Sequence, residues 1–146
     1  MTLLNISIII LTFFAMEFVA WFTHKYIMHG VLWSLHIDHH QVDKNKKFQK
    51  NDYFFLIFAI PSMILIMTGT INSNYLLYIG LGIAAYGLAY FIVHEIIIHQ
   101  RIKIFRNLNS KYIRAIKRAH KIHHKNLGKE NGESFGMLIV ALKYFK

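Results

Sequence analysis

The histidines of this 146-residue chain follow two repeated spacings. An H-x4-H pair is followed by an H-x2-H-H triplet, and both patterns return in the same order in the second half. A single histidine is most often a packed or solvent-facing ring, but rings without a common task would not all fall into two repeated spacings. The set therefore predicts metal binding, because imidazole is a ligand for iron, zinc, copper and nickel. The four stretches contain all 10 histidines: His24, His29, His36, His39, His40, His94, His99, His120, His123 and His124.

Each spacing predicts a local geometry. Residues i, i+3 and i+4 are neighbours on an α-helix, so each H-x2-H-H triplet presents its imidazoles on one helix face. Residues i and i+5 lie about 140° apart on a regular helix, so an H-x4-H pair cannot address one ion from mid-helix. We therefore expect the second histidine of each pair where the helix ends or loosens, and Gly30 directly after His29 fits such an end. Five imidazoles in each half are too many for one ion and ample for two.

The composition narrows the class of protein. The chain has no cysteine, which excludes thiolate-ligated haem, iron–sulfur clusters and Cys-type zinc sites. Apolar residues make up 55% of the chain and occur in long runs, as in integral membrane proteins. We expect an all-α membrane helical bundle that forms one domain, residues 1–146. The net charge of +10 would suggest nucleic-acid binding in a soluble protein, but membrane topology explains it better.

Three segments must position the histidines across the bilayer. The first has neither a basic start nor a clear small-residue cleavage site, so we expect an uncleaved helix rather than a signal peptide. It also runs directly into His24, so cleavage would leave the first histidine pair at a bare end. The three segments that are long and apolar enough to span are residues 3–22, 53–70 and 75–98.

The second and third spans are expected to form a hairpin through the polar turn at residues 71–74. Pro61 is expected to kink the second span. Three glycines of the third span, Gly80, Gly82 and Gly87, would permit close helix contact. Residues 134–145 are apolar but too short to cross unaided, so we expect a re-entrant or interfacial segment there, with a fourth helix as one possibility.

The distribution of the 17 lysines and arginines predicts the orientation. They fall at 25, 44–50, 101–129 and 143–146, and none lies in the 71–74 turn. The positive-inside rule then places the N-terminus outside and both basic segments in the cytoplasm. The first span enters the cytoplasm at His24–His29 and the third at His94–His99, so all four histidine stretches are expected on the cytoplasmic face.

Three carboxylates could tune bound ions as outer partners of the ligands: Glu17, Asp38 and Glu95. Glu17 lies inside the first span, where an acidic residue is costly and indicates function. It precedes His24 by seven residues, so the two share nearly one helix face. Glu17 could therefore hold a ligand imidazole by its second nitrogen; the alternative is a carboxylate near the membrane boundary, neutral or paired.

A histidine-rich site at the mouth of an apolar bundle suits the oxidation of a long hydrocarbon lying between the spans. Unactivated C–H bonds require a powerful oxidant, which metal-activated O₂ can supply and side chains alone cannot. Two ions that share this task must lie close together, which predicts that the two halves of the chain interleave.

Several motifs resemble the membrane-bound fatty-acid hydroxylase and sterol desaturase superfamily, and within it the bacterial β-carotene hydroxylases. The resemblance runs from about residue 17 to 140. It is carried by the stretch from His24 to Gly30, Trp33 with His36, His39 and His40, Asn51-Asp52, the stretch from Tyr90 to His94, His99-Gln100-Arg101, the stretch from Ala119 to His124, and Ser134-Phe135-Gly136. Two departures, Glu133 before Ser134 and a short C-terminus, concern the last apolar segment and not the site.

The resemblance implies 3-hydroxylation of β-ionone rings, giving zeaxanthin by way of β-cryptoxanthin. It also implies a centre of two non-haem iron ions, O₂ as co-substrate, electrons from a ferredoxin-type donor, and a place in the bacterial plasma membrane. The alternatives are a fatty-acid or sterol hydroxylase of the same superfamily and a membrane metal-binding or metal-transport protein. Transport would place ligands along the spans, whereas these gather at one face.

Overall fold

The structure, a computed structural model, describes residues 1–43, 45, 46 and 48–146; the predicted cytoplasmic Lys44 and Lys47 lie outside them. All regular elements of the described residues are helical, as predicted. The α-helices are α1 (Leu3–Phe22), α2 (Trp33–His40), α3 (Phe54–Ile71), α4 (Leu76–Tyr90) and α5 (Lys111–Lys125). Two π-helices (Thr23–Val31 and Phe91–Ile98) extend α1 and α4, and short 3-10 helices cover Lys50–Tyr53 and Leu142–Phe145.

Three helical stretches can cross a membrane by length and composition, as the sequence predicts: Leu3–Val31, Lys50–Ile71 and Leu76–Ile98. Few of their side chains are buried within the protein, because apolar surface that faces lipid needs no protein partner. The helix α3 continues through Pro61. The helix α4 packs against both α1 and α3, and the turn after Ile71 joins α3 and α4 into the predicted hairpin.

Two of the three predicted contact glycines lie where helices touch. A Cβ on Gly80 would lie 2.9 Å from the carbonyl oxygen of Ser62 in α3, and a Cβ on Gly82 would lie 2.8 Å from the carbonyl oxygen of Ile9 in α1. Both distances are too short for a side chain, so these glycines allow α4 to approach its two neighbours. Gly87 has open space around it, and the prediction of a close contact there is wrong.

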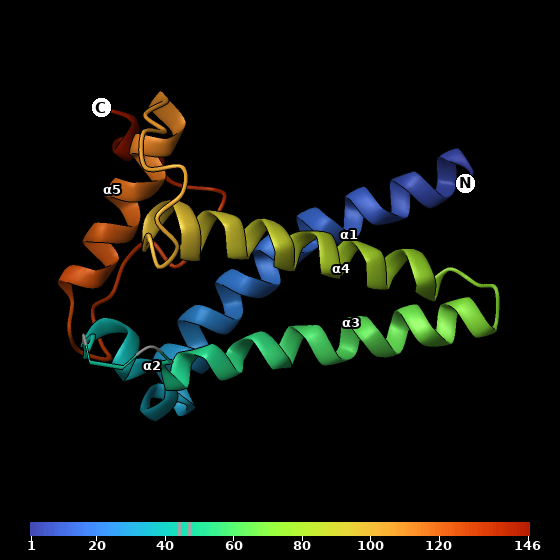
Figure 1. The fold of residues 1–146 in the computed structure, drawn as a ribbon, viewed down its shortest axis with the longest axis horizontal. Coiled ribbons are helices and arrows are strands. Elements are labelled where there is room, and N and C mark those ends of the chain that lie inside the picture. The colour runs from blue at the N-terminus through green and yellow to red at the C-terminus, as the bar shows by residue number, and fades with distance from the viewer. Residues whose placement is uncertain (44, 47) are drawn as a thin grey trace.

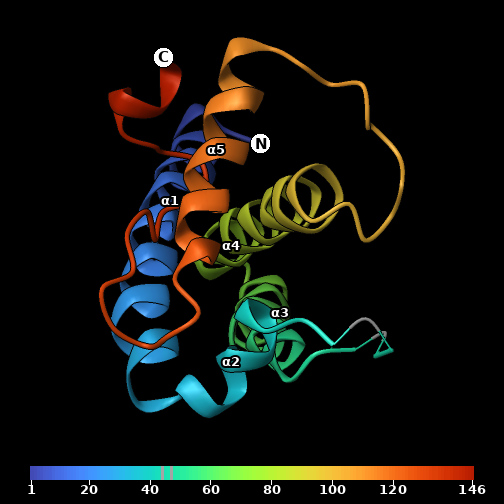
Figure 2. The same ribbon diagram turned by 90° about the vertical axis from the view of Figure 1, so that its left-hand side faces the viewer.

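The segments that carry histidine gather at one end of the molecule. Figure 1 shows the C-terminal ends of α1 and α4 at the left, together with α2 and α5, while the N-terminus and the α3–α4 turn lie at the right. Figure 2, which faces that left-hand end, shows α2 and α5 in front of the ends of α3 and α4. The expectation that the histidine stretches meet at one end of the bundle is confirmed.

The segment after α5 does not form a fourth α-helix, which the sequence had left as one possibility. Residues 126–141 form an irregular strap, and a regular structure begins only with the 3-10 helix Leu142–Phe145. Tyr144 of this helix packs on Ala115 and Ala119 of α5. The apolar character of residues 134–145 reflects this packing and the cover that the strap provides for the histidines. The backbone N–H and C=O groups of the strap bond to side chains of other elements instead of forming helical hydrogen bonds.

Candidate metal centre

A π-helix brings each H-x4-H pair together. His24 and His29 lie within Thr23–Val31, while His94 lies within Phe91–Ile98 and His99 is the C-cap of that helix. In a π-helix the N–H of residue i+5 donates to the carbonyl of residue i, so the two residues lie on one face. The His99 N–H donates to the His94 carbonyl in this way at 2.9 Å. The ring centroids are 4.5 Å apart for His94 and His99 and 5.3 Å apart for His24 and His29. The predicted loosening of the helix is confirmed, and Gly30 leaves helical geometry directly after His29.

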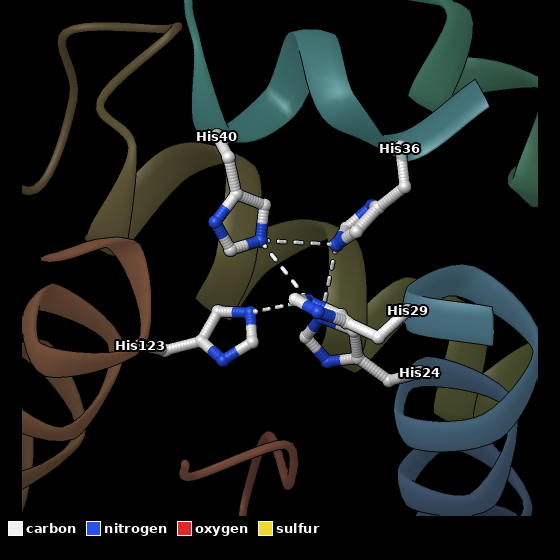
Figure 3. A group of neighbouring side chains, drawn as sticks. All are labelled: His24, His29, His36, His40 and His123. Carbon is white, nitrogen blue, oxygen red and sulfur yellow. Dashed lines mark hydrogen bonds between the residues drawn. The ribbon is translucent and has the colours of Figure 1, made fainter. Parts of the chain in front are cut away.

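Five buried histidines form the first group, which we call cluster one: His24, His29, His36, His40 and His123. Figure 3 shows their imidazoles converging from three directions, from the first π-helix, from α2 and from α5. The Nε2–Nε2 distances are 3.2 Å for His24–His36, 3.1 Å for His29–His40 and 3.3 Å for His29–His123. Nitrogens bound to one ion at about 2.1 Å lie roughly 2.9–3.4 Å apart at octahedral to tetrahedral angles, so these spacings suit a single ion.

The outer nitrogens of cluster one determine the tautomers. Each Nδ1 lies 2.6–3.0 Å from an oxygen. Four of these oxygens are backbone carbonyls, which accept and cannot donate, so the proton must be on Nδ1. Each Nε2 then presents a lone pair toward its neighbours, an arrangement that repels itself unless a cation lies between them. The pairs, with Nδ1 donating, are His24 to Phe135, His29 to Lys129, His40 to Asn126, His123 to Glu133, and His36 to Oδ1 of Asn51.

Four further histidines form cluster two: His39, His99, His120 and His124. The Nε2 atoms of His99 and His120 are 2.8 Å apart. The Nε2 atoms of His39 and His124 are buried and have no hydrogen-bond partner among the described residues. Because buried polar atoms are almost always satisfied, these two orphaned nitrogens fit a metal ion as the missing partner.

His94 lies next to cluster two but is not a member of it, because its ring nitrogens are not close enough to the ligand atoms of all four histidines. Its ring stacks on His39 with centroids 4.9 Å apart, and its Nδ1 donates to Glu95 Oε1 at 2.6 Å. Arg101 bridges Glu95 to Asp52, with Nη1–oxygen distances of 2.9 Å and 2.7 Å. Such a carboxylate partner fixes the tautomer and the orientation of the ring.

The two halves of the chain interleave by exchanging one histidine each. Cluster one takes four residues from the first half and His123 from the second, whereas cluster two takes His39 from the first half and the others from the second. The clusters adjoin, because the rings of His40 and His124 stack with centroids 4.6 Å apart. The predicted interleaving is confirmed.

Seven of the imidazoles belong to residues outside the membrane-spanning segments, and burial keeps these seven neutral. Removal from water disfavours the charged form and is the largest cause of each shift, and the neighbouring imidazoles add to it. Neutral imidazole is the form that binds metal, so the site is ready for an ion at pH 7. The pKa values fall to about 2 for His36 and His99, about 3 for His123 and His124 and about 4 for His40, and the pKa values of His39 and His120 also lie well below 6.5.

The three predicted carboxylates have different positions. Glu95 contacts an imidazole directly, as expected. Asp38 accepts from the backbone N–H groups of Lys50 and Asn51 and so acts one step away, through the amide that binds His36. Of the two alternatives for Glu17, the structure supports a carboxylate paired with other groups and not a contact with an imidazole. The first π-helix turns His24 toward the Phe135 carbonyl, and the strap lies beside Glu17.

Sequence reasoning missed several partners of the imidazoles. Gln49 accepts from His39 Nδ1 at 2.9 Å. Four carbonyls of the strap also escaped notice, because a backbone carbonyl has no signature in the sequence. The Asn51-Asp52 pair was visible only through the family resemblance.

Comparison with known proteins agrees with this geometry. Residues 9–142 match the fatty acid hydroxylase family. The chain belongs to that family. The β-carotene hydroxylase of Pantoea ananas is 42% identical over 135 residues, which cover 92% of this chain and 76% of that protein. The β-carotene hydroxylase of Pseudescherichia vulneris is 41% identical over 136 residues, which cover 93% and 77%.

Plant proteins are also among the similar proteins. The chloroplastic β-carotene hydroxylase 2 of Capsicum annuum is 34% identical over 128 residues, which cover 85% of this chain and 41% of that longer protein. No solved structure gives a significant match. The resemblance seen in the histidine motifs is thus confirmed, and the three apolar helices indicate a membrane protein.

Proposed function

We propose that residues 1–146 form one catalytic domain that hydroxylates the β-ionone rings of β-carotene at C3, giving zeaxanthin by way of β-cryptoxanthin. Two iron ions, one in each cluster, are the proposed cofactors. The single observation that carries the proposal is the pair of adjoining clusters of neutral imidazoles at one end of an apolar bundle. The names of the bacterial relatives support β-carotene as the substrate.

The proposed reaction converts a ring C–H bond and O₂ to C–OH and water, and it consumes two electrons and two protons. Iron would supply the activation of O₂, which no side chain of the chain can perform. We propose that electrons come from a ferredoxin-type protein, since the reaction needs a reductant and the predicted cytoplasmic segments are basic.

The residues of the chain have three tasks in this proposal. The nine histidines of the two clusters ligate the ions, with Nε2 as the ligand atom wherever Nδ1 donates to an oxygen, and His94, the tenth predicted ligand, lies beside cluster two. The carbonyls and amides around them hold the Nδ1 protons and so keep the Nε2 lone pairs directed inward. The strap, the half-buried Phe135 above all, shields cluster one from water, because its ring centroid lies 5.1–5.5 Å from those of His24, His29 and His123.

We further propose that the protein is a multi-pass protein of the bacterial plasma membrane with its metal centre on the cytoplasmic face. The histidine segments lie at one end of the molecule, which supports a metal centre at a single face of the membrane. The lysine and arginine distribution supports the cytoplasmic face. A long apolar carotenoid would reach this centre from the bilayer.

Expression in β-carotene-producing bacteria tests the function. Extracts should contain zeaxanthin and some β-cryptoxanthin, and cells with the His36→Ala variant should keep β-carotene. A variant of an exposed residue, Glu130→Gln, serves as the matched control and should behave as wild type. Unchanged β-carotene at wild-type protein levels would overturn the proposed substrate, and new hydroxylated fatty acids or sterols in the same extracts would then identify the alternative.

A further inference from the structure

Glu17 is the acidic residue that the metal site leaves without a task. It lies inside the first span, yet its side chain is buried rather than exposed to lipid. Its Oε1 accepts from the backbone N–H groups of Met137, Leu138 and Ile139, at 2.9, 2.9 and 3.0 Å. Its Oε2 accepts from the Tyr86 hydroxyl of α4 at 2.7 Å. One carboxyl group thus ties α1 and α4 to the end of the strap.

The strap is also the main source of acceptors for cluster one. Four of the five Nδ1 atoms of that cluster donate to strap carbonyls, those of residues 126, 129, 133 and 135. The nearest of these, Phe135, stands only two residues before the first N–H that Glu17 binds. Among the described contacts, no strap carbonyl accepts a hydrogen bond from cluster two. The partners on that side are Gln49, which accepts from His39, and Glu95, which accepts from the neighbouring His94.

The conformation of the strap needs such an anchor. Asn131 and Ser134 adopt left-handed backbone with φ of 61° and 63°, which costs residues other than glycine free energy. At Gly136, a Cβ would lie 2.8 Å from the Ile139 carbonyl and 3.3 Å from Glu17 Oε1, so the chain passes close to the carboxyl group there. Between the end of α5 and the helix at Leu142, the strap has no regular structure of its own to hold these carbonyls in place.

We propose that Glu17 is a positioning residue for cluster one: it anchors the strap, and the strap carbonyls orient the imidazoles of that cluster alone. The inference rests on the proposed metal binding. Loss of the carboxyl group leaves three N–H groups without an acceptor at membrane depth, where no water replaces it. The strap then moves, the Nδ1 partners are lost, and the ion of cluster one is held less tightly while that of cluster two is kept.

The test is the iron content of purified protein after loading with Fe(II) and desalting, measured for single and combined variants. Wild type should hold two ions per chain, one for each group. Glu17→Leu, which is isosteric enough to fill the site and favours membrane insertion, should hold about one, with iron affinity at cluster one reduced about 10–100-fold. Glu17→Gln keeps one acceptor oxygen for the three N–H groups and should hold more iron than Glu17→Leu. Glu130→Gln, the same change on the exposed side of the strap, should match wild type.

Combined variants assign the loss to a cluster. With cluster one already emptied by changing His24, His36 and His40 together to alanine, which leaves two of its five imidazoles, Glu17→Leu should remove no more iron. Combined with His120→Ala, which affects cluster two, it should remove nearly all. Two ions bound with unchanged affinity in Glu17→Leu would overturn the inference. Equal losses in Glu17→Gln and Glu17→Leu would also overturn it, as would further iron loss when Glu17→Leu is added to the triple histidine variant. Wild-type protein that binds no iron would instead overturn the proposed function.

Discussion

The exchange of one histidine between the halves of the chain makes a quantitative prediction. His39→Ala and His123→Ala each remove the single imidazole that crosses from one half to the other cluster. Because O₂ activation is proposed to need both ions, each variant should lose nearly all hydroxylation while the protein still inserts in the membrane.

The two variants should differ in iron content. Cluster one offers five imidazoles, so His123→Ala leaves four, whereas cluster two offers four and His39→Ala leaves three. Outer partners of ligands typically change metal affinity about 10–100-fold, and a ligand should matter at least as much. We therefore expect His39→Ala to weaken iron binding at cluster two by at least about 100-fold, or about 2.8 kcal/mol, with a smaller change at cluster one for His123→Ala.

The assay pairs zeaxanthin formation in β-carotene-producing cells with iron titration of the purified variants. Ser34→Ala in α2 and Lys121→Ala in α5 are the matched controls, because both side chains are exposed on the same helices. Near-normal turnover in either histidine variant, at matched protein levels, would refute the coupled two-ion mechanism. Greater iron loss in His123→Ala than in His39→Ala would refute the assignment of ligands to clusters.

Three further predictions concern orientation, the Arg101 bridge and pH. A reporter fused after Asn72 should read as outside the cytoplasm and one fused after Lys129 as inside, and the reverse pattern would contradict the cytoplasmic site. Arg101→Met removes the guanidinium that bridges two carboxylates, so hydroxylation should fall about 10–100-fold, while the exposed Lys103→Met retains wild-type activity. Burial lowers the pKa of His40 from 6.5 to about 4, so the unfolded chain takes up its proton first as the pH falls. Thermal melts of metal-free protein in detergent should therefore show stability falling between about pH 6.5 and 4, and an acid-independent melting temperature would disprove the neutral, buried state.

Local features of the sequence were enough to predict the three apolar spans and to single out the histidines as candidate metal ligands. Apolar length is sufficient to recognise a candidate span, since the hydrocarbon core of a typical bilayer is about 30 Å thick. The sequence therefore predicted α1 with both ends correct and the α3–α4 hairpin nearly so. Two repeated histidine spacings predicted which side chains would meet, and the lysine and arginine distribution predicted that they would do so at one end.

Only the tertiary structure determines how the histidines are divided between the two clusters. Nothing in the spacing of His39 or His123 shows that each crosses to the other cluster, because that depends on how α2 and α5 face each other. Residues 134–145 are apolar enough to allow a helix, but most of them belong to the irregular strap, because backbone groups there form long-range hydrogen bonds instead of helical ones. Glu17 was recognised as costly and thus functional, yet the three backbone N–H groups that it binds lie 120 to 122 residues away. Local spacing determines which groups can share a face, whereas only the folded chain determines which distant carbonyl or N–H group completes each one.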